Sequence, residues 1–219
     1  MARAEEGRVV FQKKSFQASE QSREDVAEER ARWARRVKRT DPRRLIFLDE
    51  SGVRVGMKRL YGRSAKGWRV VDRASGGHWQ THTMTAAIGL GGVITAMVTK
   101  KAINSITFLG FIEEFLAPQL KPGDLVVMDN LAVHKVKGVE EALQVVGARA
   151  WFLPPYSPDF NPIEQAWSQA KSWLRKKSPP TFDQLVVAIG DALRRVTPTH
   201  CQNYFANSGY RVPPKSKTL

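Results

Sequence analysis

The stretch that decides the fold reads Trp151-Phe-Leu-Pro-Pro-Tyr-Ser-Pro-Asp-Phe-Asn-Pro-Ile-Glu-Gln-Ala-Trp167. It begins as an apolar strand, and its first three prolines then stop regular pairing because proline has no backbone N–H to donate. Asn161 and Pro162 predict a helix start, with a side-chain cap followed by proline at the first helical position. Glu164 then falls in the first helical turn, where free N–H groups and the helix dipole favour an ionised carboxylate.

Glu164 also has a purely structural interpretation. Because it follows Asn161 by three residues, its side chain can close a capping box at the start of the helix. The local pattern leaves both interpretations open. A catalytic role requires further acids at strand ends upstream.

The composition indicates a globular chain with a polyanionic partner. The 219 residues are 42% hydrophobic and suit one domain, or one domain with a short appendage. Lys and Arg number 35 against 21 Asp and Glu, a net charge of +14 that favours nucleic acid, although ribosomal and membrane-surface proteins share it. The single cysteine, Cys201, excludes an internal disulfide and a cysteine-based zinc cluster. With no apolar leader at the N-terminus, we expect a cytoplasmic, nucleoid-associated protein.

One uncharged segment, residues 83–99, is long enough to raise the question of a membrane span. It is rich in Thr and is interrupted by Gly89, Gly91 and Gly92. A β-hairpin that turns at Gly91-Gly92 explains this composition better than a membrane helix does. We therefore expect no membrane partner.

The chain divides into three predicted parts. Residues 1–42 comprise a basic tail and a charged helix over 19–37, whose apolar stripe is Val26, Trp33 and Val37. That helix either docks on the core by its stripe or contacts DNA through its arginines. Residues 43–209 form the main domain, and 210–219 form a C-terminal tail.

The order of elements in the main domain predicts an α/β fold with a mixed five-stranded sheet flanked by helices. Six candidate segments for these five strands lie at 45–48, 67–71, 81–90, 93–99, 124–128 and 149–153, with 67–71 among three successive strands that can pair antiparallel. Helices are expected at 106–117, capped by Ser105, at 136–146 and 164–177, at 182–196, capped by Thr181, and at 198–207. This order is that of a ribonuclease H-like fold, in which the strands at 45–48 and 125–128 lie side by side and parallel.

This topology brings three acids together. Asp49 and Asp129 each follow a buried strand and emerge at the same sheet edge, and Glu164 reaches that edge from its helix. Each like-charge pair costs about 4 kcal/mol at ~4 Å and an effective dielectric of about 20. Divalent metal relieves this cost, and oxygen ligands select Mg²⁺ or Mn²⁺. Two such ions can activate a water or 3′-hydroxyl and hold the leaving oxygen of a phosphodiester.

Three motifs of this chain resemble those of DDE transposases of the mariner superfamily, in its bacterial insertion-sequence branch. The motifs are Phe47-Leu-Asp-Glu-Ser-Gly52, Met128-Asp-Asn-Leu-Ala-Val-His-Lys135 and the run from Tyr156 to Trp167. The resemblance implies that Asp49, Asp129 and Glu164 are the metal-binding catalytic triad, and that Asn130 and His134 shape the site or touch DNA. It further implies DNA cleavage at element ends, joining to a target at TA, and a dimer or larger assembly.

The resemblance also raises an expectation about the N-terminal part. Transposases of this family carry helix-turn-helix modules that recognise the element ends, and residues 1–42 are too few to hold them. We therefore expect the catalytic half, either a separately encoded reading frame whose helix-turn-helix partner recognises the ends, or a truncated copy.

Basic residues near the acids are the candidate DNA contacts. Lys135 adjoins His134, for which a surface or DNA-facing position is favoured over a general-base role. Four more lie on the helix of Glu164, where a solvated helix face is the alternative: Lys171, Arg175, Lys176 and Lys177. Glu50 points away from Asp49 in an extended strand. Two other functions stay open: a ribonuclease H-like nuclease acting on RNA–DNA hybrids or junctions, and a non-catalytic DNA-binding remnant.

Overall fold

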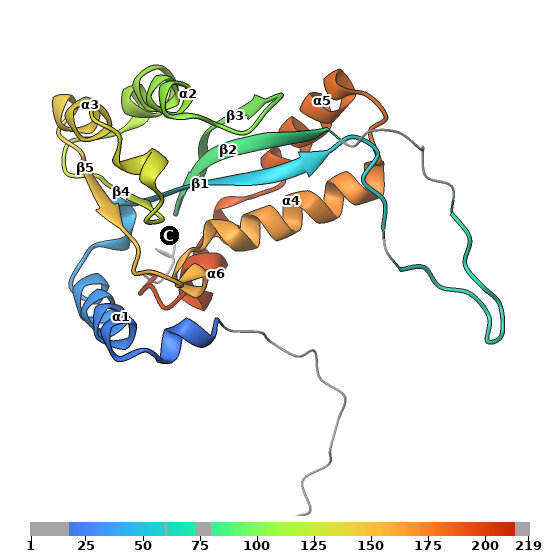
Figure 1. The fold of residues 1–219 in the computed structure, drawn as a ribbon, viewed down its shortest axis with the longest axis horizontal. Helices are drawn as coiled ribbons and strands as arrows, with labels where there is room; N and C mark the ends of the chain where they lie inside the picture. The colour runs from blue at the N-terminus through green and yellow to red at the C-terminus, as the bar shows by residue number, and fades with distance from the viewer. Residues whose placement is uncertain (1–17, 60, 73–79, 213–219) are drawn as a thin grey trace, which may run out of the picture.

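The computed structural model describes residues 18–59, 61–72 and 80–212, and its centre is a mixed five-stranded sheet with helices on both faces (Figure 1). The strand order is β3-β2-β1-β4-β5. β1 pairs antiparallel with β2, β2 antiparallel with β3, and β4 lies parallel to both β1 and β5. The strands are β1 (Leu45–Arg54), β2 (Thr81–Gly89), β3 (Gly92–Thr99), β4 (Leu125–Met128) and β5 (Arg149–Phe152). The predicted ribonuclease H-like architecture is confirmed.

Two helical layers enclose the sheet, and each buries its own hydrophobic core. On one face pack α1 (Glu24–Val37), α4 (Ile163–Lys177), α5 (Phe182–Arg194) and α6 (Pro198–Asn207). On the other face pack α2 (Ser105–Gly110) and α3 (Val139–Val145). In β1, Leu45 and Phe47 face the first layer, whereas Ile46 and Leu48 face the second. A strand buried on both faces reads as an unbroken apolar run, which is why its place at the sheet centre could be predicted.

The sheet differs from expectation at two places. β1 does not end at Asp49 but continues to Arg54, because Asp49 pairs with Ala86 and Arg54 with Thr81 of β2. The predicted strand at 67–71 is wrong: residues 68–72 lie outside the sheet, with Trp68 77% exposed. β2 already has β1 on one side and β3 on the other, so no position beside it is free.

Helix starts also differ from the predictions. Asn104, rather than Ser105, caps α2 by accepting from the Thr107 N–H at 2.9 Å. α2 widens into a π-helical turn (Phe111–Leu116) and ends in a 3-10 turn (Ala117–Gln119). α3 starts later than predicted, at Val139, and follows a 3-10 turn at Ala132–Lys135. α5 begins at its predicted cap, since the Thr181 hydroxyl accepts from the Gln184 N–H.

α1 is attached to the main domain by its predicted apolar stripe. Val26, Trp33 and Val37 are all buried. The Trp33 indole N–H donates to the Tyr210 hydroxyl at 3.3 Å, and the ring packs edge-on against Trp151. The docking interpretation of this helix therefore holds, whereas the division of the chain at 42/43 and 209/210 stays a prediction. None of the helices in the described part of the chain has the length and hydrophobicity that a bilayer crossing requires.

Candidate active site

Asp49, Asp129 and Glu164 line one pocket of about 460 Å³ at the edge of the sheet. Asp49 lies within β1, Asp129 directly follows β4, and Glu164 lies in the first turn of α4. β1 and β4 are parallel neighbours, so their acids meet at one edge as expected. The loop over 153–158 forms another wall of this pocket.

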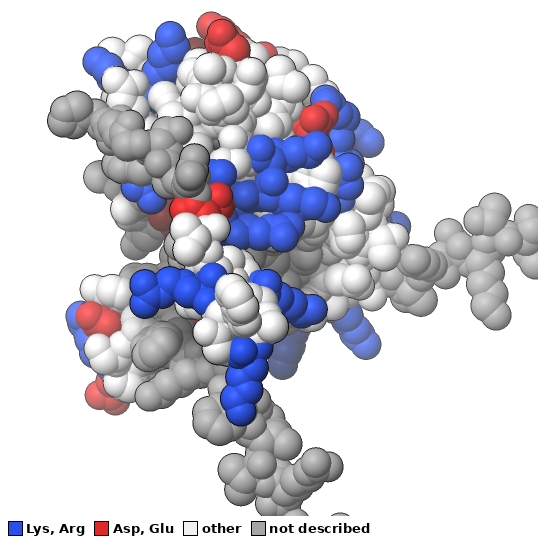
Figure 2. Space-filling model, turned by 90° about the vertical axis from the view of Figure 1, so that its right-hand side faces the viewer, with Lys and Arg blue, Asp and Glu red and all other residues white. Residues whose placement is uncertain are grey.

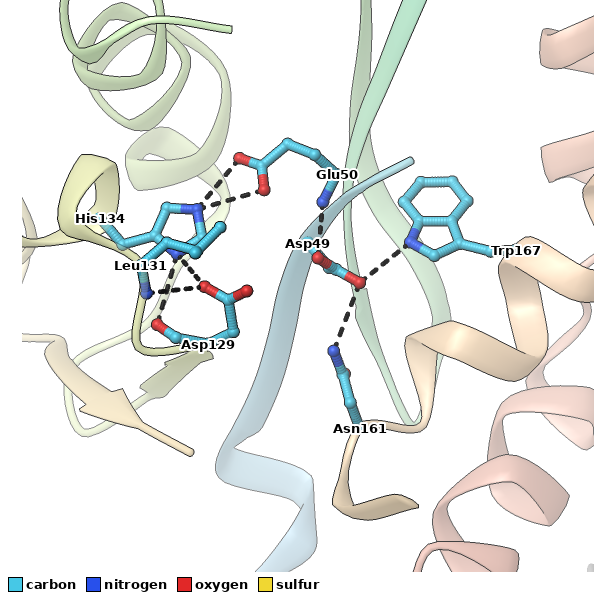
Figure 3. A network of polar contacts seen from close by, with 7 residues as sticks. All are labelled: Asp49, Glu50, Asp129, Leu131, His134, Asn161 and Trp167. Carbon is cyan, nitrogen blue, oxygen red and sulfur yellow. Dashed lines mark hydrogen bonds and ion pairs between the residues drawn. The ribbon is translucent and has the colours of Figure 1, made fainter. Parts of the chain in front are cut away.

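The Asp49 carboxylate is held by hydrogen bonds at both oxygens (Figure 3). Its Oδ1 accepts from the Glu50 backbone N–H at 2.8 Å. Its Oδ2 accepts from the Trp167 indole N–H at 3.3 Å and from the Asn161 amide at 3.4 Å. Burial, and next the negative charge of Glu164, raise the pKa of Asp49 to about 7.

Asn161 and Trp167 are site residues whose roles the sequence reasoning missed. Asn161 was expected to cap α4, but the helix start has no side-chain cap and its amide turns to Asp49 instead. Trp167 is buried core as expected, yet its single polar atom reaches the same carboxylate. The two residues flank Glu164 at equal spacing, so one helix start both presents an acid and orients another. The signal was the Asn-x-x-Glu-x-x-Trp spacing itself.

Asp129 is held by a buried histidine that joins it to Glu50. His134 is fully buried, with Nδ1 at 2.7 Å from Asp129 Oδ1 and Nε2 at 3.1 Å from Glu50 Oε2. Both ring nitrogens face carboxylate oxygens, an arrangement that suits the doubly protonated imidazolium. Burial lowers the pKa of His134, but the hydrogen bonds and charges of Asp129 and Glu50 outweigh burial and raise it to about 10. Burial raises the pKa of Asp129, but hydrogen bonds from His134 and the Leu131 N–H hold it below its usual value.

This position corrects the interpretation of His134. A surface or DNA-facing position was favoured, but a side chain with 0% exposure lies out of reach of DNA. Of the two roles that the resemblance implied, burial agrees with shaping the site. Glu50 does point away from Asp49, because successive side chains of a strand alternate, and that alternation carries it to His134 (Figure 3).

Contacts with the N-terminal part brace the loop that walls the pocket. Tyr156 has a left-handed backbone, with φ 53°, which costs a non-glycine residue about 1–3 kcal/mol. The Gln21 amide donates to the Tyr156 carbonyl at 2.6 Å. Arg30 donates to the Ser157 hydroxyl and forms a two-point ion pair with Asp159. Asp159, expected to shape the turn, thus also ties it to α1.

Glu164 is exposed and points into the pocket rather than closing a capping box, since the start of α4 has no side-chain cap. Although the residue as a whole is exposed, partial desolvation of its carboxylate inside the pocket raises its pKa; Lys171 acts to lower the pKa and the charge of Asp129 to raise it. Lys171 and Arg175 follow Glu164 by seven and eleven residues and so share its stripe of the helix. The other candidate DNA contacts are exposed: Asn130, Lys135, Lys176 and Lys177.

The pocket fits divalent metal in the chemistry of its donors. Three carboxylates line it, and Asn161 Oδ1 is buried with no hydrogen-bond partner among the described residues. Within the described ranges no three Asp, Glu, His or Cys side chains are grouped closely enough to enclose one ion. Mg²⁺ does not need such a cage, because it is usually bound by one or two carboxylates together with substrate phosphates and water.

A pocket lined by carboxylates suits metal-assisted chemistry at a phosphodiester. The family model described as DDE superfamily endonuclease matches residues 44–186, more than half of the chain. The protein therefore belongs to the DDE superfamily of endonucleases. No curated protein is significantly similar to it in sequence.

Solved structures of Mos1 transposase share its fold. The paired-end complex with the left transposon end is 16% identical, with a TM-score of 0.66 over 95% of this chain and 69% of that chain. The strand transfer complex is 15% identical, with a TM-score of 0.69 over 93% of this chain and 63% of that chain. The catalytic domain with raltegravir and Mn is 12% identical, with a TM-score of 0.59 over 91% of this chain and 100% of that chain. Paired-end complexes of that transposase were solved with Mn and with Mg.

Proposed function

We propose that this chain is a transposase catalytic domain that cuts DNA strands and joins them to a target, with Asp49, Asp129 and Glu164 as its catalytic triad. The observation that carries the proposal is the single pocket lined by all three acids, each presented by a different element. Membership of the DDE superfamily of endonucleases and the fold shared with Mos1 transposase support it.

The three carboxylates would hold one or two Mg²⁺ or Mn²⁺ ions. Such ions activate the attacking oxygen and stabilise the leaving oxygen in an in-line displacement at phosphorus. Asn161 and Trp167 keep the Asp49 carboxylate aimed at the pocket, and His134 does the same for Asp129. Ligands oriented by such partners lose about 10–100-fold in metal affinity or activity when a partner is removed.

The substrate and partners follow from the same proposal. Lys171 and Arg175 share the stripe of Glu164 and would contact the phosphates beside the scissile bond. Asn130, which lines the pocket, and the exposed Lys135 would make further contacts. The target would be a TA dinucleotide, and the working unit a dimer or larger assembly on DNA. We also propose membership of the bacterial insertion-sequence branch, end recognition by a separately encoded helix-turn-helix protein, and action at the nucleoid.

Strand transfer tests this function directly. A labelled, pre-cut duplex is incubated with supercoiled plasmid and the protein in Mg²⁺ or Mn²⁺, and the junctions are sequenced. The expected product is plasmid carrying the label, joined at TA. Hydrolysis of RNA–DNA hybrids with no joining would indicate a different ribonuclease H-like nuclease. DNA binding without metal-dependent cleavage or joining would indicate a non-catalytic remnant.

A further inference from the structure

A basic groove lies beside α4, outside the acid pocket. One cavity of about 650 Å³ is lined by α4 and the connection from α5 to α6, and Trp173 is among its lining residues. A second cavity of about 430 Å³ shares Arg59 and Ser172 with the first. No Asp or Glu lines either cavity among the described residues. The cations that line the first cavity are Arg59, Lys176, Arg194 and Arg195, whereas Arg175 lines only the second.

Two cations of this groove lie over an aromatic ring, and among the described residues only Arg194 has a carboxylate partner. The Arg195 guanidinium stacks on the Trp173 ring at 3.7 Å, and Lys176 lies over the same ring at 5.6 Å. Arg194 pairs with Asp191 at 2.5 Å, so its charge is partly offset. Arg59, Lys176 and Arg195 form no ion pair with a carboxylate in the described part of the chain. Figure 2, which views the side on which α4 ends, shows Lys and Arg side chains gathered over this face.

The groove and the acid pocket lie on different faces of α4. Trp173 follows Glu164 by nine residues, which is two and a half helical turns, so the two side chains project to opposite sides about 14 Å apart along the axis. Lys171 and Arg175, by contrast, project with Glu164. The stripe that borders the acid pocket therefore carries Lys171 and Arg175, whereas Trp173 faces the opposite side of the helix.

We propose that this groove, defined by Arg59, Trp173, Lys176 and Arg195, binds the phosphate backbone of a second duplex DNA segment while the first occupies the acid pocket. The inference rests on the proposed function for its partner, since strand joining needs two DNA segments on one protein. Guanidinium and ammonium groups without carboxylate partners bind phosphates and release the counterions of DNA. The Trp173 ring is covered by Arg195, so it serves as a platform for that cation rather than for a base.

The number of duplexes bound by each chain tests this groove. Sedimentation velocity measures it with a fluorescent duplex of about 10 base pairs, one helical turn, in Ca²⁺ in place of Mg²⁺. The parent chain is expected to bind two duplexes. The double variant Arg59→Glu/Lys176→Glu, which reverses two charges of the groove, is expected to bind only one. Lys101→Glu/Lys121→Glu reverses two exposed lysines elsewhere and is expected to bind two. A circular dichroism spectrum of each variant checks that it is folded.

The salt dependence gives a second measurement with milder variants. In the double variant Lys176→Ala/Arg195→Ala, the slope of log K for duplex binding against log salt concentration should become shallower by about 2. This value corresponds to about 0.9 for each lost phosphate contact. A parent chain that binds fewer than two duplexes, or a groove variant that still binds two with an unchanged slope, would overturn the inference. DNA nicking in Mg²⁺ is measured in a separate experiment. If the chain binds two duplexes but does not nick DNA, the result supports the groove and counts against the proposed function.

Discussion

His134→Ala is expected to lower the free energy of unfolding by about 1.5–3 kcal/mol, because it removes the cation that donates to two partly buried carboxylates. Glu50 is 13% exposed and Asp129 39% exposed at the side chain, and both hold their hydrogen bonds to the imidazole. The ring also packs on Phe108, with centroids 4.6 Å apart, so truncation opens a cavity as well. Urea unfolding at pH 7 measures the loss.

A double-mutant cycle separates the charge from the cavity. Glu50→Gln and His134→Gln each break the pair, whereas the double variant removes both charges and should be more stable than the sum of the single losses predicts. A coupling energy of about 1–3 kcal/mol is expected between the two positions. Additive losses would contradict the ion pair, and a stable His134→Ala would contradict the buried network altogether.

Asp49→Asn is expected to stabilise the metal-free protein above pH 7. The pKa of Asp49 rises from 3.8 in the unfolded chain to about 7 in the folded one, so only the folded state holds the proton between these values. The stability from this proton is complete below about pH 4 and is lost as the pH rises through 7. A shift of about three units corresponds to roughly 4 kcal/mol.

The measurement is urea unfolding of both chains in EDTA from pH 4 to 8. The difference between variant and parent should grow in favour of Asp49→Asn over this range, while other carboxylates contribute equally to both curves. Mg²⁺ or Mn²⁺ at pH 8 should stabilise the parent and not the variant. A difference that stays constant with pH would show that Asp49 is ionised in the folded protein over this range. It would contradict a pKa raised by burial and by the charge of Glu164.

Much of the fold could be predicted because it depends on local pattern. The apolar runs of β1 and β4 place both strands in the sheet interior, and their parallel pairing brings Asp49 and Asp129 to one edge. What could not be predicted depends on neighbours far along the chain. Asp49 lies within a longer strand because Ala86 pairs with it, and 67–71 is excluded because β3 occupies the outer side of β2.

The candidate site shows the same division at the level of side chains. Glu164 in the first turn of α4 follows from Pro162 and the preceding loop. From the sequence, the side chain of Asn161 could either cap the helix or contact Asp49. It contacts Asp49 because α4 packs against β1. His134 looked like a surface residue beside Lys135, yet the turn before α3 directs its ring between two carboxylates. Hydrogen bonds between distant elements leave no local periodicity to find.

Metal-dependent nicking of supercoiled plasmid tests the central claim most directly. The parent chain is compared in Mg²⁺, Mn²⁺ and EDTA with Asp49→Asn, Asp129→Asn and Glu164→Gln, and with the exposed Glu113→Gln as a matched control. Circular dichroism confirms equal folding. We expect nicking by the parent and the control in either metal, and a loss of at least about 10²–10³-fold in each triad variant. Nicking that survives in all three triad variants would contradict the assignment of the active site.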